Sequence, residues 1–72
     1  MTRETVYINT PFIRLSALLK FCGAAETGGQ AKDSISRGEV SVDGEVCLIS
    51  GKKIYPGAVI SVGEEEYEVA VL

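Results

Sequence analysis

The spacing of apolar residues changes once, midway along the chain, and this change sets the fold class. In the first half, Leu15, Leu18 and Cys22 recur at steps of three and four, as they would on one face of an α-helix. In the second half, Val40 and Val42 alternate with polar neighbours, as they would in a β-strand. We therefore predict an α+β chain in which the helical part precedes most of the strands.

The first helix is predicted to follow a short strand over Thr5 to Ile8. Thr10 is expected to cap this helix, and Pro11 suits its first position because the N–H that proline lacks has no partner there. Phe12 is then expected on the apolar face of the helix. Gly23 is predicted to end the helix as a left-handed cap.

A second helix is predicted from about residues 27–29 to Arg37, with Ala31 and Ile35 facing inward because they lie four positions apart. Gly38 is expected to stop it. Two helices joined by so few residues cannot bury their apolar faces separately, so we predict that they pack against each other at an angle.

The Asp43-Gly44 pair is the strongest hairpin signal in the chain. A strict two-residue turn would place Val42 opposite Glu45 and mix apolar with polar side chains on one face. A bulged turn would align Val40 and Val42 with Val46 and Leu48 on one apolar face, so we predict the bulge.

Further strands are predicted over Ala58 to Val62 and Tyr67 to Val71, after a Tyr55-Pro56-Gly57 turn. The predicted architecture is one α+β domain over residues 1–72. In it, a two-helix αα motif packs on a small, mostly antiparallel sheet of four to five strands. Tyr7, Tyr55 and Tyr67 lie beside apolar residues and are expected to pack in the core, the alternative being that they offer stacking platforms.

The charges divide unequally between the two halves of the chain. The formal net charge is −3, yet residues 1–38 hold five basic against three acidic side chains, a net of +2. Residues 39–72 hold two basic against seven acidic side chains, a net of −5. A basic helical half permits an anion-binding surface although the total charge is negative.

Several classes of function have little support in the sequence. The chain has no histidine, which excludes imidazole catalysis and histidine metal ligands. Cys22 and Cys47 lie 25 positions apart without zinc-type partners and are expected to be buried, reduced thiols. No apolar run approaches the length of a membrane span, and no secretory signal begins the chain. We expect a cytoplasmic protein that is not an enzyme and has no cofactor, metal, membrane or small-molecule ligand.

In two segments the chain resembles the RNA-binding domain named for small-subunit ribosomal protein S-four: PFIRLSALLKFCGAAETGGQAKDSISRGEVSVDGEV and GKKIYPGAVISV. The resemblance covers residues 11 to 62 and is greatest to small stand-alone bacterial proteins with a T-G-G-x-A-K variant. It implies the alpha-L arrangement, a helix–loop–helix on a curved sheet, with RNA bound along the outer helical surface and the hairpin edge. It also implies ribosomal RNA or a ribosome precursor as the ligand. Because a net charge of −3 makes binding to unstructured polyanions weak, we expect a structured RNA, and we expect the chain to be a monomer.

The resemblance assigns RNA contacts by position to Arg14, Gly28, Gly29, Gln30, Lys32, Lys52 and Lys53. Three positions depart from the family pattern. Ser16 stands where an aspartate is frequent, Ser36 stands where a basic residue is frequent, and Leu48-Ile49-Ser50 replaces part of a basic run.

The chemistry of the two glycines and the nearby lysine agrees with this assignment. Gly28 and Gly29 begin a helix, where unpaired N–H groups and the helix dipole favour a phosphate. Alternatively, the glycines only permit a tight turn between the helices. Lys32 lies one turn further on and either reaches the same phosphate or is simply solvated.

The remaining candidates also have two interpretations each. Arg14 lies among apolar residues, and its planar fork suits a phosphate. Arg37 is a candidate RNA contact, but an ion pair with Asp33 four residues earlier explains it equally well. Gln30 can bond a base edge or a sugar hydroxyl, or it is a surface residue without a role. Lys52 and Lys53 alternate along a strand, so at most one faces the helices.

A second function remains open from the sequence. The acidic strand half, with its GEEEYE segment, would suit a protein-interaction module that docks a basic partner through the sheet. In that case the RNA surface would have decayed, as the serines at positions 16 and 36 suggest.

Overall fold

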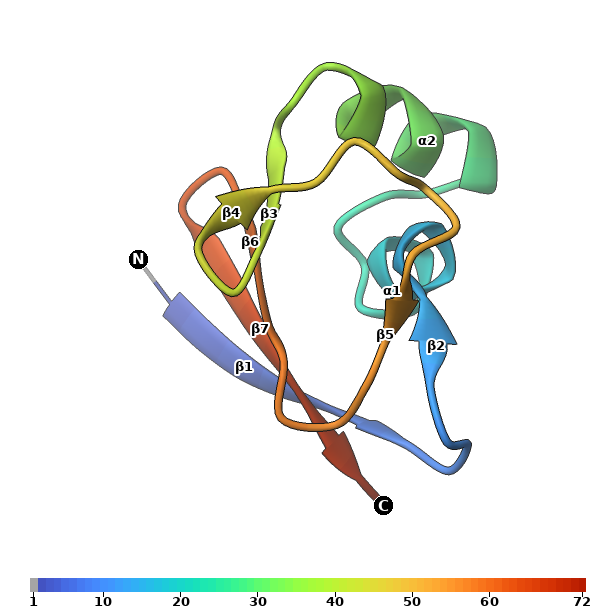
Figure 1. Cartoon of the computed structure of the whole chain (residues 1–72), viewed down its shortest axis with the longest axis vertical. Helices are drawn as coiled ribbons and strands as arrows, with labels where there is room; N and C mark the ends of the chain where they lie inside the picture. The colour runs from blue at the N-terminus through green and yellow to red at the C-terminus, as the bar shows by residue number, and fades with distance from the viewer. Residues whose placement is uncertain (1) are drawn as a thin grey trace.

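In the computed structural model, which describes residues 2–72, a curled sheet faces two short helices (Figure 1). The elements in chain order are β1 (Thr2–Ile8), β2 (Ile13–Arg14), α1 (Leu15–Phe21), α2 (Gly28–Ser36), β3 (Val40–Val42), β4 (Glu45–Val46), β5 (Lys53–Ile54), β6 (Val59–Val62) and β7 (Glu65–Val71). The predicted α+β class, with a two-helix motif on a mostly antiparallel sheet, is confirmed.

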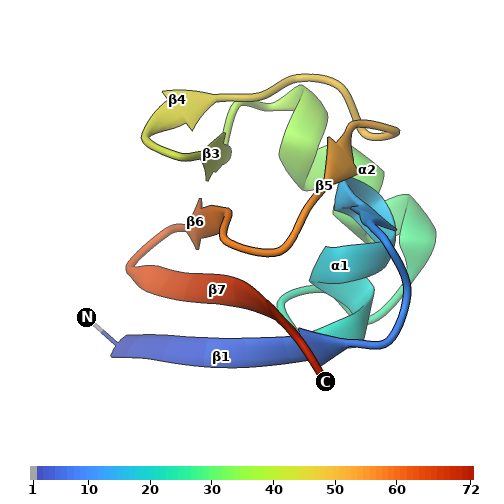
Figure 2. The same ribbon diagram turned by 60° about the horizontal axis from the view of Figure 1, so that its bottom comes forward.

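The described strands form two sheets. The larger has the order β1-β7-β6-β3-β4, and the smaller pairs β2 with β5 beside α1 (Figure 2). The pairing of β1 with β7 is parallel, with Val6 opposite Val69, and the other pairings are antiparallel. This parallel pair joins the two ends of the chain, and local sequence patterns do not reveal such a distant pairing.

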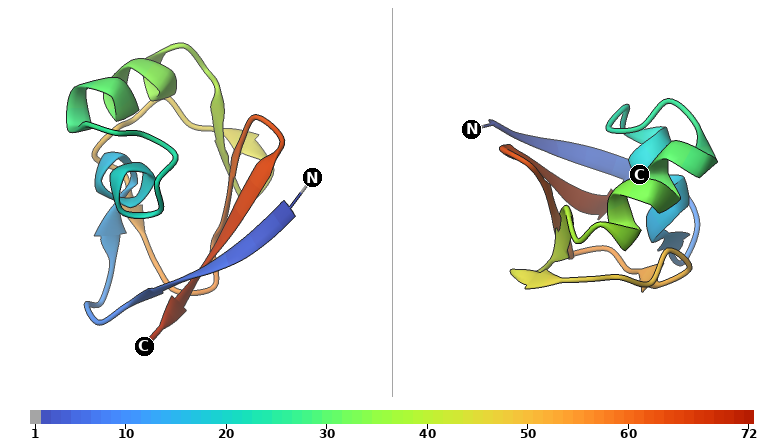
Figure 3. Two further views of the ribbon diagram at one scale, coloured as in Figure 1. Left: turned by 180° about the vertical axis from the view of Figure 1, so that it is seen from behind. Right: turned by 90° about the horizontal axis from the view of Figure 1, so that it is seen from above.

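The core lies between the large sheet and the helices, which cover the same face of the sheet in both views of Figure 3. Alternate residues of the strands point toward the helices, as the period of two requires. The buried apolar residues are Val6, Ile8, Leu15, Leu18, Leu19, Ala25, Ala31, Ile35, Val40, Cys47, Ile54, Ile60, Tyr67 and Val69. Both helices therefore place their apolar faces in one shared core.

The start of the first helix differs from the prediction. The helix begins at Leu15 with Arg14 as its N-cap residue, while Thr10 donates a hydrogen bond to the Phe12 carbonyl instead of capping. Ile13 and Arg14 are extended because they pair with β5, so Phe12 lies outside the helix. The end agrees with the prediction, since Gly23 has a φ of +86°. A distant strand has overridden the local helix signal.

The second helix agrees closely with the prediction. It spans Gly28–Ser36, with Thr27 as N-cap and Arg37 as C-cap, and it buries Ala31 and Ile35. Within residues 2–72, neither helix has the length and apolar character needed to cross a membrane.

The predicted bulge in the hairpin is wrong. Val42 lies opposite Glu45 across a strict two-residue turn, in which Asp43 and Gly44 have φ values of +51° and +89°. Asp43 stabilises this turn from β6, because its Oδ1 accepts from the Val59 N–H at 3.0 Å and its own N–H donates to the Val59 carbonyl at 2.8 Å. As a result Val46 points outward, and Cys47 takes the buried position instead.

The predicted burial of the three tyrosines is correct for Tyr67 and wrong for Tyr7 and Tyr55, which are both exposed. Tyr7 lies on the face of β1 that points away from the helices, since its neighbours Val6 and Ile8 point inward. Tyr55 follows β5 and packs beside Phe12 instead of in the core. Apolar neighbours in the sequence therefore indicated burial correctly for one of these three tyrosines only.

Stability is expected to fall at alkaline pH. Burial raises the pKa of the Cys22 thiol and of the Tyr67 hydroxyl. The folded chain then keeps protons that the unfolded chain has released, so the free energy of unfolding falls as pH rises. The loss should begin near the ordinary thiol pKa of about 8.5 and continue past about 10, the ordinary tyrosine value.

Urea unfolding measured across this pH range tests the expectation. The variant Cys22→Ala should keep a constant free energy of unfolding until Tyr67 begins to titrate, at about pH 10. An identical decline in the variant and the parent chain would contradict the role of the thiol.

Candidate nucleic-acid interface

The small sheet of β2 and β5 positions two cations at the start of α1. Arg14 lies directly opposite Lys53 in this antiparallel pair. The N–H of Leu15 donates to the Lys52 carbonyl at 2.9 Å, and the N–H of Ser16 donates to the Ser50 carbonyl at 3.0 Å. These carbonyls cap the first turn of α1, so the segment that carries Lys52 and Lys53 is held against the helix.

We call the group Phe12, Arg14, Lys52, Lys53 and Tyr55 the ribbon site. Arg14 is exposed, and its Nη1 donates to the Gly51 carbonyl at 2.8 Å. Its guanidinium lies 5.4 Å from the centre of the Phe12 ring, and the Lys53 Nζ lies 5.0 Å from the same centre. One anchored donor orients the guanidinium while its other N–H groups remain able to bind an anion.

Phe12 and Tyr55 also belong to this site, although the sequence assigned Phe12 to a helix face and favoured the core over a stacking role for Tyr55. Their ring centres are 5.9 Å apart with a tilt of 50°. Phe12 lies two residues before Arg14, and Tyr55 lies two residues after Lys53, which places each aromatic residue on the same side of an extended segment as its cation. This spacing of two residues was visible in the sequence, but it was not used because the segment from Pro11 was expected to be helical.

The N-terminus of α2 is an open backbone surface. Within residues 2–72, the N–H groups of Gly28 and Gly29 have no hydrogen-bond partner. A Cβ built on Gly28 would meet nothing within 4 Å, and one on Gly29 would meet only the Thr27 Oγ1 at 4.0 Å. Neither glycine is among those with a positive φ. Neither the backbone conformation nor the space around these two residues therefore requires glycine, in contrast to the tight-turn interpretation.

Gln30 stabilises the start of α2. Its N–H donates to the Thr27 Oγ1 at 3.0 Å, and its side-chain Oε1 accepts from the Glu26 N–H at 2.6 Å. These reciprocal bonds resemble a capping box and hold the loop before the helix in place. The Oε1 atom is therefore already bonded, and the amide nitrogen is the part of Gln30 that a ligand can contact.

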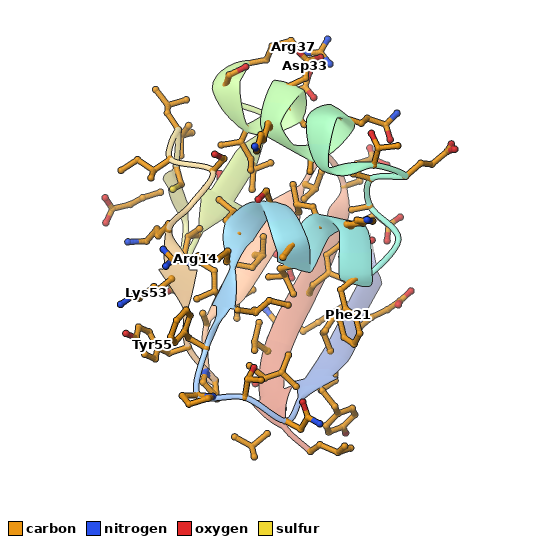
Figure 4. The ribbon with its side chains drawn as sticks, turned by 90° about the vertical axis from the view of Figure 1, so that its right-hand side faces the viewer. Arg14, Phe21, Asp33, Arg37, Lys53 and Tyr55 are labelled. Atoms are coloured by element: carbon orange, nitrogen blue, oxygen red, sulfur yellow. The ribbon has the colours of Figure 1, made fainter. Side chains whose placement is uncertain are left out.

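Arg37 lies at the opposite end of α2 from the two glycines. It pairs with Asp33 at 2.7 Å, and its Nε lies 3.8 Å from a carboxylate oxygen of Glu39. Figure 4 shows Arg37 and Asp33 together above α2, away from Arg14 and Lys53. Its charge is thus partly neutralised, as the ion-pair interpretation of the sequence suggested.

The sequence candidates therefore form two groups with Arg37 apart. Arg14, Lys52 and Lys53 gather at the start of α1, and Gly28 to Gln30 lie at the start of α2, with Lys32 one turn further along. The loop over residues 22–27 joins the far end of α1 to the start of α2. A ligand that contacts both groups must therefore reach from one helix start to the other.

The cations beside the two helix starts are not paired with the acidic residues of the chain. Within residues 2–72, ion pairs involve Arg3, with Glu66 at 3.1 Å, and Arg37. Arg14, Lys32, Lys52 and Lys53 have none in the same region, and neither does Lys20 in the last turn of α1. The positive charge beside the two helix starts is therefore available to a ligand even though the total is −3. The described residues also contain no group of three or more cysteine or carboxylate side chains placed to hold a metal ion.

Known proteins share both the sequence and the fold. Residues 6–70 match the family model of the S4 domain, the S-four domain introduced above. The Escherichia coli K12 protein named "Putative RNA-binding protein YbcJ" is 39% identical over 59 residues, which cover 82% of this chain and 84% of YbcJ. YbcJ of Shigella flexneri, named as uncharacterized, has the same identity and coverage.

The solution structure of Escherichia coli YbcJ has the same architecture. It aligns with a TM-score of 0.68 at 34% identity and covers 94% of this chain and 85% of YbcJ. That structure is described as revealing an alpha-L motif involved in RNA binding. The match to the family model over most of the chain, together with this likeness, shows that the protein belongs to the S4 domain family.

Proposed function

We propose that this protein is a non-catalytic RNA-binding protein that recognises structured RNA, namely ribosomal RNA or a ribosome precursor. It acts as a monomer in the cytoplasm. The observation that carries the proposal is the pairing of Arg14 with Lys53 beside α1, where no ion pair neutralises either cation within residues 2–72. The names of the relatives, which refer to RNA binding, support the same function.

The proposed contacts are mainly to phosphates. At the ribbon site, Arg14, Lys52 and Lys53 bind phosphates of the RNA backbone. At the start of α2, the N–H groups of Gly28 and Gly29 bind a second phosphate. Lys32 contributes from the first turns of that helix. Because the net charge is −3, binding to unstructured polyanions is weak, so an RNA shape that matches both groups is required.

Crosslinking in living cells, followed by sequencing of the bound RNA, tests this function. The chain is compared with the double variant Arg14→Glu with Lys32→Glu. Ribosomal RNA should be enriched with the parent protein and lost with the variant. Equal recovery of ribosomal RNA from both proteins would contradict the proposed RNA-binding surface. A protein partner that binds through the acidic sheet would be retained by both proteins.

Substitution of the two glycines separates a role in binding from a role in folding. The double variant Gly28→Ala with Gly29→Ala should be as stable as the parent chain or up to about 1 kcal/mol more stable, because alanine favours a helix and meets open space here. RNA affinity should fall by about 3-fold to 10-fold, because methyl groups hold a phosphate away from the N–H groups.

Thermal unfolding and fluorescence anisotropy measure the two effects. Ser34→Ala, within the same helix, is the control and should leave the affinity unchanged. A glycine variant that is more stable and binds RNA as well as the parent chain would show that the backbone at Gly28 and Gly29 does not contact the ligand.

A further inference from the structure

A hollow of about 460 Å³ adjoins the ribbon site. Tyr55 and Pro56 line one part of it, and Lys52, Lys53 and Asp43 line others. The Asp43 carboxylate is already engaged, since one oxygen accepts from the Val59 N–H and holds the hairpin turn. The lining therefore includes two lysines and one carboxylate, so its formal charge favours a ligand that carries negative charge.

Tyr55 is the aromatic residue of the ribbon site that remains available. The Phe12 ring already has the Arg14 guanidinium and the Lys53 ammonium near it. Tyr55 packs against Phe12 on one side, yet 54% of its surface is exposed. Figure 4 shows Tyr55 and Lys53 next to each other below Arg14. An exposed ring fixed by a neighbour and flanked by cations has the composition of a base-stacking site.

We propose that Tyr55 stacks on one unpaired base of the bound RNA, which enters this hollow while Lys52 and Lys53 bind the adjoining phosphates. The inference rests on the proposed RNA-binding function and specifies its ligand as RNA with a bulged or looped nucleotide. Bases inside a duplex are stacked on their neighbours and cannot present a face to a protein ring. The site therefore distinguishes an RNA with an unpaired nucleotide from a continuous duplex.

Two RNA hairpins of equal length test the inference on the full chain. One carries a single bulged 2-aminopurine nucleotide and the other is fully paired. The parent protein should bind the bulged hairpin more tightly and quench its fluorescence through stacking. Tyr55→Leu should weaken binding of the bulged hairpin by about 5-fold to 150-fold, remove the quenching and leave the salt dependence of the affinity unchanged.

Two further variants make the result specific. Tyr55→Phe keeps the ring and should retain both the affinity and the quenching. Tyr7→Leu is the matched control, because Tyr7 is 55% exposed and Tyr55 54%, but Tyr7 lies on β1 outside the ribbon site. It should bind both hairpins as the parent protein does. Circular dichroism establishes that each variant is folded.

The outcomes separate this inference from the proposed function. If Tyr55→Leu binds the bulged hairpin as well as the parent protein, the stacking site is overturned. If Arg14→Glu with Lys32→Glu nevertheless loses binding to both hairpins, the proposed RNA-binding function still stands. If the parent protein binds neither hairpin more tightly than that charge-reversal variant does, both the function and the stacking site are overturned.

Discussion

RNA affinity is expected to fall by roughly 10-fold to 100-fold at about 0.1 M salt when Arg14 and Lys53 are both replaced by glutamine. The two side chains lie opposite each other across the β2–β5 pair and have no ion pair within residues 2–72. Each substitution should remove one charge-assisted phosphate contact. The dependence of log affinity on log salt should therefore become shallower by about 1.4, at about 0.7 for each contact.

A matched control removes the same charge elsewhere. Arg3→Gln with Lys20→Gln also changes the formal net charge from −3 to −5, but Arg3 pairs with Glu66 on the sheet and Lys20 lies in the last turn of α1. Fluorescence anisotropy with the bulged hairpin, measured over a range of salt concentrations, compares the two variants. If both lose affinity equally, overall charge and not the ribbon site determines binding.

The second large effect concerns folding. Leu18→Ala is expected to lower the free energy of unfolding by about 2–5 kcal/mol, because it leaves a cavity in a core that cannot readily collapse. Leu18 is fully buried, with 0% of its surface exposed, and belongs to the hydrophobic core. A chain of 72 residues has a total stability of only about 4–11 kcal/mol, so the variant should lose a large share of it and unfold at a lower urea concentration than the parent chain.

Urea unfolding followed by circular dichroism measures this loss. Phe21→Ala is the control, since Phe21 ends the same helix and is 63% exposed. It should change the free energy of unfolding by no more than about 0.5 kcal/mol. A Leu18→Ala variant that is as stable as Phe21→Ala would contradict the packing of α1 described above.

Much of the fold could be predicted from local patterns, because burial imposes them directly. The second helix shows this best. Thr27 caps it, Ala31 and Ile35 face the core at a spacing of four, and Gly38 ends it with a φ of +76°. Each of these features depends on residues within a few positions of each other. A single sequence contains that information in full.

The errors occurred where distant segments pair. The segment of Phe12 to Arg14 has the local pattern of a helix start, but in the folded chain it pairs with β5 as a strand. Carbonyls of the segment before β5 then accept hydrogen bonds from the first N–H groups of α1 and so cap the helix. Likewise, Asp43 looks like the start of a bulged turn until Val59 of β6 bonds to both its side chain and its backbone. In both places, backbone hydrogen bonds to a remote strand outweigh a local preference.

The candidate site divides in the same way. The basic and glycine residues were predicted from their positions, and the structure separates them into two groups with Arg37 in ion pairs. The aromatic part of the ribbon site was not the preferred prediction. Phe12 was assigned to a helix face and Tyr55 to the core, whereas β2 and β5 place them side by side with Arg14 and Lys53 around them.

Local patterns were enough to predict the α+β class, the two helices, the hairpin position and the presence of cations on the helical half, because periodicity and composition are local properties. Which cations and rings meet depends instead on pairing between residues about forty positions apart, such as Arg14 and Lys53, and is evident only in the folded chain. The same holds for the absence of acidic partners beside these cations within residues 2–72. Contacts of this kind depend on register and on the path of the chain, which no short stretch of sequence specifies.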